Sequence, residues 1–102
     1  MNNIEIKLYN KKIYIYKYIN LDNLMKIITI LEEYMKDIYE IEIDFKNLLN
    51  SNSAVLLFII NSIRYSMKNK KKIKFLNLSD NLLELSKVYN LYDIIIKKIK
   101  ED

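Results

Sequence analysis

Polar and apolar residues alternate in two short stretches near the amino terminus. Ile4, Ile6 and Leu8 alternate with polar residues, and residues 13–19 alternate isoleucine with tyrosine and lysine after a break at residues 10–12. A period of two is typical of β-strands that bury one face. We therefore predict a hairpin of two strands.

The spacing of the apolar residues changes after Asp22. From there they recur at intervals of three and four positions, while charged residues take the other face; the apolar set is Leu24, Ile27, Ile28, Leu31, Tyr34 and Met35. This spacing predicts an amphipathic helix. Asp22 is the expected cap of its amino end.

The same two periods predict a strand, a helix, a strand and a helix in the rest of the chain. The two strands are expected over residues 39–45 and 71–78, and the largely buried helix between them over residues 54–67. Ser79 is placed to cap the last helix, which Asn90 ends. The remaining stretch to residue 100 fits a short strand or a helix, and periodicity does not decide.

The order of the predicted elements is β-β-α-β-α-β-α with a terminal element. Strands joined through helices are expected to be parallel neighbours with right-handed crossovers. We therefore predict one α/β domain over residues 1–102, in which helices pack against a mixed sheet of four to five strands. The hydrophobic content of 51% suits one packed core at this length.

The composition excludes several kinds of chemistry. The sequence has no cysteine and no histidine, so it lacks thiolate metal sites, cysteine nucleophiles and the commonest general base. It also lacks glycine, which the Gly-rich nucleotide-binding loops require. We expect a protein that is not an enzyme and that uses no cofactor and no metal. Its turns depend on asparagine, as at Asn10, Asn20, Asn50 and Asn90.

The formal charge of +4 comes mainly from lysines in residues 68–74 and 97–100. The cluster from Lys68 to Lys74, near Tyr65, is compatible with nucleic-acid or anionic-lipid binding. A solvated connection between a helix and a strand explains the same lysines and is the more common case. We therefore favour the solvated connection over a nucleic-acid partner.

Two further sets of side chains are interpreted as parts of sheet faces. Glu40, Glu42 and Asp44 form a carboxylate row that could serve acid–base work or a divalent cation, but an alternating strand carries such a row on its polar face. Three tyrosines, at positions 14, 16 and 18, lack the arrangement of an RNA-stacking platform. They suit an exposed or partly covered sheet face or a contact surface.

Neither a signal peptide nor a membrane span is expected. Residues 1–9 contain no uninterrupted apolar core, and the longest apolar run, residues 54–60, is too short to cross a bilayer. We predict a cytoplasmic protein.

The order of elements and three short motifs resemble the STAS domain family. Ile43-Asp44-Phe45 matches the family's strand end, and Asn52-Ser53-Ala54-Val55-Leu56 falls where its Asp-Ser-x-Gly-Leu motif opens a helix. Leu78-Ser79 and residues 91–95 fit the later strand end and the closing motif. Asn52 stands in place of the motif's acidic residue, and Val55 in place of its glycine.

Within the family, residues 85–91 look most like the STAS subunit of the bacterial lipid-asymmetry ABC transporter. The resemblance implies a non-catalytic regulatory or accessory protein that docks on the ATPase of a lipid-transport ABC system. The docking residues that it implies are Asn50, Ser51, Asn52, Ser53, Ala54, Leu57 and Phe58.

Two other functions remain open. The family also implies an anti-sigma-factor antagonist, whose partner kinase phosphorylates the serine at the position of Ser53. The third hypothesis, which rests on the lysine clusters, is a basic module that binds nucleic acid or an anionic surface.

Ser53 is the expected centre of the site because of its position at a helix amino end. Free backbone N–H groups and the helix dipole favour an anion there. A phosphate would add about −1.5 to −2 charges to a docking surface. The plainer interpretation is that Ser53, or Asn52, only caps the helix.

Overall fold

The first two strands form the predicted hairpin. The structure is a computed structural model that describes residues 5–99, so the predicted strand residue Ile4 lies outside the described part. Strand β1 (Ile6–Tyr9) pairs antiparallel with β2 (Lys12–Lys17). The turn residues between them, Asn10 and Lys11, have positive φ angles of 49° and 64°. Positive φ at both central positions is characteristic of the type I′ turn, whose twist matches that of the strands.

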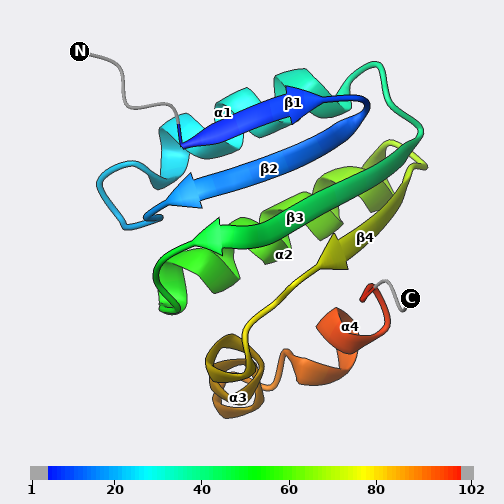
Figure 1. Ribbon diagram of the computed structural model, residues 1–102. Coiled ribbons are helices and arrows are strands. Elements are labelled where there is room, and N and C mark those ends of the chain that lie inside the picture. The colour runs from blue at the N-terminus through cyan, green and yellow to red at the C-terminus, as the bar shows by residue number, and fades with distance from the viewer. Residues whose placement is uncertain (1–4, 100–102) are drawn as a thin grey trace.

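Within residues 5–99, four strands form one sheet in the order β1-β2-β3-β4. Strand β3 (Glu40–Leu48) runs parallel to both β2 and β4 (Lys72–Leu76). Helices α1 (Leu24–Met35) and α2 (Ser53–Lys68) make the two crossovers and cover the same face of the sheet (Figure 1). The predicted α/β architecture, a mixed sheet with helices packed against it, is confirmed.

Three phenylalanines fix α2 against the middle of the sheet. Phe45 on β3 meets Phe58 on α2 and Phe75 on β4 edge to face, with ring centroids 6.1 and 5.9 Å apart. All three rings are buried. Because aromatic rings bury large apolar areas and edge contacts add to that, this cluster stabilises the position from which α2 presents its outer face.

Strand β3 continues to Leu48, beyond its predicted end at Phe45. The prediction ended too early because a bulge interrupts the alternation of buried and exposed residues there. The pairing with β2 passes from Tyr14 opposite Asp44 to Tyr16 opposite Asn47, which places one extra residue in β3. Two adjacent residues, Asp44 and Phe45, are therefore both buried.

Asp44 lies inside β3, not at its end. Its Oδ1 accepts hydrogen bonds from the Lys46 N–H and from the Asn77 side chain, both at 2.9 Å. Asp44 thus stabilises the bulge and joins it to the segment after β4. The polar-face interpretation holds for Glu40 and Glu42 on the face without helices, but Asp44 is a buried structural carboxylate.

The start of α1 differs from the prediction. Its N-cap residue is Asn23, not Asp22, and no side chain caps the helix. The Asn23 side chain instead accepts from the Asn20 N–H at 2.9 Å, and the Asn20 side chain accepts from the Asn23 N–H at 3.0 Å. This reciprocal pair orders the turn before α1, so Asp22 is left as an exposed turn residue.

The carboxyl-terminal part packs beyond the end and the edge of β4 (Figure 1). Helix α3 (Asp80–Val88) is capped by Ser79, as predicted: the Ser79 side chain accepts a hydrogen bond from the Leu82 N–H. The ambiguous tail forms a short helix, α4 (Tyr92–Ile96), followed by one parallel bridge between Ile99 and Phe75.

Candidate functional site

The loop between β3 and α2 is tied to the segment after β2. The Asn50 side chain donates to the Ile19 carbonyl at 2.7 Å and accepts from the Ile19 N–H at 3.2 Å. The Leu49 N–H donates to the Lys17 carbonyl at 2.6 Å. The Asn50 side chain thus continues the pairing of the two segments beyond this backbone bond, so the loop leading into α2 is held in one position.

Asn52, not Ser53, is the N-cap of α2. The Asn52 side chain accepts from the Val55 N–H at 3.1 Å. Val55, which stands where the STAS motif has glycine, is fully buried inside the helix and needs no special backbone angle. The asparagine therefore supplies the cap that the motif's acidic residue could supply.

Ser53 is the first residue of α2 and is exposed. Its hydroxyl makes no hydrogen bond to any residue between 5 and 99. The first turn of α2 carries no acidic side chain. The hydroxyl is therefore accessible next to the positive end of a helix dipole.

Ser51 links the amino ends of α2 and α3. Its hydroxyl lies 2.8 Å from the Ser79 hydroxyl, the same group that caps α3. Through this pair the loop before α2 also supports the start of α3. The amino ends of α2 and α3 are consequently neighbours.

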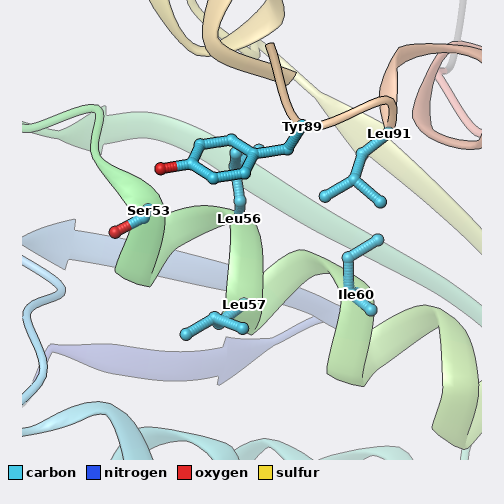
Figure 2. Close-up of a pocket in the computed structure, with 6 residues that line it drawn as sticks. All are labelled: Ser53, Leu56, Leu57, Ile60, Tyr89 and Leu91. Atoms are coloured by element: carbon cyan, nitrogen blue, oxygen red, sulfur yellow. The ribbon is translucent and has the colours of Figure 1, made fainter. Parts of the chain in front are cut away.

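An apolar groove lies between the outer face of α2 and the turn that joins α3 to α4. Its volume is about 320 Å³, and its lining consists of Ser53, Leu56, Leu57, Ile60, Tyr89 and Leu91. Figure 2 shows Ser53 and Leu57 on the α2 side, with the Tyr89 ring over the groove and its hydroxyl directed toward the Ser53 end. The groove thus combines an apolar floor with two hydroxyls at one end.

Lys87 contacts both α3 and α4 beside the turn that lines the groove. Its ammonium group lies 2.9 Å from a Glu84 oxygen and 5.0 Å from the centre of the Tyr92 ring. The hydrogen bond to Glu84, followed by its negative charge, raises the pKa of Lys87 above the usual value. The contact with Tyr92 joins the end of α3 to α4 on either side of the turn that carries Tyr89.

The predicted docking residues divide into surface and interior positions. Ser53 and Leu57 are exposed, the latter to 45%, whereas Ala54 and Phe58 are buried to 2% and 0% exposure. Ala54 and Phe58, which were predicted as docking residues, are in the core because α2 buries these sides of its first turns. They fix the helix in the core, and Asn50, Ser51 and Asn52 shape the loop.

The groove residues Tyr89 and Leu91 were not predicted as part of the site. They lie more than thirty positions after Ser53 in the sequence, and only the packing of α3 against α2 brings them together. The one indication available in the sequence was a tyrosine directly before Asn90, where the last predicted helix ends. In the structure Tyr89 is 53% exposed.

The described residues hold no arrangement typical of a metal centre or a membrane span. No three carboxylates between residues 5 and 99 are grouped so that they could hold an ion. In the same part of the chain, no helix has the length and apolar character needed to cross a bilayer. What the site offers chemically is an apolar surface with hydroxyls at its edge.

The sheet order, the single helical layer and the helix that opens at Ser53 define a fold of the STAS type. The solved structure of the anti-sigma-factor antagonist SpoIIAA in its unphosphorylated form superposes on the chain with a TM-score of 0.66, covering 86% of this chain and 81% of that one at 12% identity. No family model and no curated protein matches the sequence. The similarity therefore confirms the predicted STAS fold.

Proposed function

We propose that this chain is a non-catalytic regulatory module that binds a protein partner through the groove and its rim at Ser53. The observation that carries the proposal is the apolar groove beside an exposed serine at the amino end of α2. Exposed apolar side chains that gather around a concave surface are typical of binding sites. The STAS fold of the antagonist SpoIIAA, a regulatory protein, supports the same function.

The partner that we propose is the ATPase of a lipid-transport ABC system. The resemblance of residues 85–91 to the STAS subunit of the lipid-asymmetry transporter favours it, and these residues include Tyr89 and Leu91 of the groove. An apolar helix or strap of the ATPase would fill the groove, with its polar flank near Ser53 and the Tyr89 hydroxyl. Because Leu57 is the most exposed aliphatic side chain of the groove lining, it is the residue expected to contribute most to the contact.

The second candidate is an anti-sigma-factor antagonist that a serine kinase modifies at Ser53. The accessible hydroxyl favours it, as does the solved neighbour, an anti-sigma-factor antagonist whose structure is of the unphosphorylated form. A phosphate on Ser53 would be stabilised by the N–H groups of α2 and would place about two negative charges beside an apolar groove. Partner docking would weaken while the fold stayed intact.

Site-specific crosslinking distinguishes the two partners. A photo-crosslinking amino acid at position 57, in the protein expressed in its native cells, should capture an ABC ATPase that mass spectrometry identifies. The matched control places the same group at Met25, an exposed α1 residue outside the groove. Capture of a serine kinase would replace the first candidate by the second. Identical captures from positions 57 and 25 would contradict both.

Substitution of Ser53 tests the role of charge at the rim. Ser53→Glu should weaken binding of the captured partner by about tenfold or more, because a carboxylate must then be desolvated beside apolar groups. Its melting temperature should stay the same or rise slightly, since an acidic residue suits a helix amino end. Ser53→Gln, of the same size without charge, should bind considerably better than Ser53→Glu. Equal affinities of the two variants would rule out a charge-sensitive rim.

A further inference from the structure

The two ends of the sheet differ sharply in charge. Because β2, β3 and β4 are parallel, the connections leading into them meet at one end, on the right in Figure 1. This end comprises residues 9–12, 36–40 and 67–72, with seven lysines and two carboxylates, and we call it the basic end. The connections at the opposite end, residues 18–23, 49–53 and 77–81, contain two aspartates and neither lysine nor arginine.

Four lysines of the basic end are available for binding. Lys11, Lys68, Lys70 and Lys72 are exposed and make no ion pair with any residue in the described part of the chain. The basic end therefore carries a local excess of positive charge that no neighbouring carboxylate within residues 5–99 neutralises by direct contact.

Lys71 has a different, structural role. It is half-buried and donates to the Lys36 carbonyl at 3.0 Å and to the Ile38 carbonyl at 2.8 Å, just after the end of α1. The Lys71 N–H donates to the Ser66 carbonyl at 2.7 Å. These bonds join the turn after α2 to the connection before β3. The backbone that carries the exposed lysines is therefore fixed in position.

The basic end also carries large, exposed side chains that are wholly or partly apolar. Tyr9, Tyr39 and Met67, one from each connection, are 68%, 59% and 67% exposed. Tyrosine prefers the boundary between water and lipid, and lysine can place its stem along apolar material while its charge stays in water. Interfacial membrane contacts combine apolar side chains with lysines in this way.

We propose that the basic end binds the surface of an anionic lipid membrane, with Tyr9, Tyr39 and Met67 in the headgroup layer and the free lysines at the lipid phosphates. Lipid is favoured over nucleic acid because the basic end contains no arginine, whose planar guanidinium suits phosphate and base recognition. Bound in this way, the protein turns its opposite end, with Ser53, away from the membrane.

Vesicle binding tests the proposal directly. The full chain should co-sediment with phosphatidylcholine vesicles that contain roughly 30% phosphatidylserine and not with pure phosphatidylcholine vesicles. Binding should fall steeply with added salt, because the charges act over about a Debye length. Replacing Lys68 and Lys70 together by glutamine should weaken binding by about 25-fold, at about fivefold for each lysine.

Matched controls separate the basic end from net charge. The double variant Lys26→Gln/Lys46→Gln removes two exposed lysines elsewhere on the molecule and should bind nearly as well as the original chain. Met67→Ser should weaken vesicle binding several-fold, whereas Met25→Ser, at a residue of similar exposure on α1, should not. Circular dichroism and thermal unfolding verify that every variant is folded.

Three results would overturn the proposal. The first is no binding to the anionic vesicles at low salt. The second is an equal loss in the Lys68/Lys70 and Lys26/Lys46 variants. The third is tighter binding of a single- or double-stranded oligonucleotide than of the vesicles, which would assign the basic end to nucleic acid. None of these results depends on the partner that binds near Ser53.

Discussion

At the scale of single residues, the absence of glycine means that other residues must adopt the positive φ angles that turns require. Between residues 5 and 99, six residues have positive φ: Asn10, Lys11, Lys17, Lys70, Asn77 and Asn90. Asparagine tolerates this conformation, so Asn10 and Asn90 could be predicted as turn residues from sequence. Lysine has no such tendency and loses roughly 1–2 kcal/mol there. The left-handed lysines could not be predicted, because the turns on which they lie are imposed by the surrounding strands and helices.

The hairpin turn offers a direct measurement of this cost. Lys11→Gly would create Asn-Gly, the sequence that type I′ turns prefer. We expect the free energy of unfolding in urea to rise by about 1 kcal/mol, because glycine adopts positive φ without steric cost. Lys11→Ala removes the same charge but keeps a Cβ atom, and it should give no comparable gain. A similar rise in both variants would mean that charge, not backbone strain, is responsible.

Asp44 is the residue whose interpretation changed most. Asp44→Ala would leave the Lys46 N–H and the Asn77 side chain without their acceptor in a largely buried place. We expect a loss of about 1–3 kcal/mol in the free energy of unfolding. The control is Glu40→Ala on the same strand, which is exposed and should change stability by less than about 0.5 kcal/mol. Equal effects of the two substitutions would show that Asp44 does not hold the bulge.

At the scale of elements, the order of strands and helices was predictable because each has a clear period. The residues at which the elements begin and end were less predictable. The bulge in β3 breaks the alternation after Asp44, and the Asn20–Asn23 pair displaces the cap of α1 from Asp22. Residues 91–96 are mainly apolar without a period, and in the structure they form a helix that packs against α3, ahead of the bridge to β4.

The candidate site was predictable only in part. Ser53 could be placed at a helix start because a polar break precedes an apolar run. Tyr89 and Leu91 could not, because the groove exists only once α3 has packed on α2. The burial of Phe58 likewise depends on the rings of Phe45 and Phe75 from two different strands.

The helix caps give a prediction at this scale. Ser79→Ala should destabilise the protein by about 1 kcal/mol, because it removes the cap of α3 and the bond to Ser51. Hydrogen exchange in α3 should accelerate more than in α2. Ser53→Ala, one residue inside the first turn of α2 and without a hydrogen-bond partner in the described part, should leave stability nearly unchanged. A larger loss for Ser53→Ala than for Ser79→Ala would contradict the assignment of the caps.

At the scale of the whole molecule, two functional surfaces are proposed for opposite ends of one sheet. Parallel strands produce this separation, because their connections alternate between the two ends. The uncharged and acidic connections surround Ser53, and the lysine-rich connections lie at the basic end. A membrane contact at one end would leave the groove free for a protein partner at the other.

The most direct test of the central claim is the affinity of the isolated partner for two single variants of this chain. Leu57→Ser removes the most exposed aliphatic side chain of the groove, and Met25→Ser removes an exposed apolar residue on α1. By isothermal titration, Leu57→Ser should bind about 30-fold more weakly than the original chain, as expected for an apolar residue that carries much of the binding energy, and Met25→Ser should bind equally well. Unchanged affinity of a folded Leu57→Ser variant would contradict the claim that the groove beside Ser53 is the docking surface.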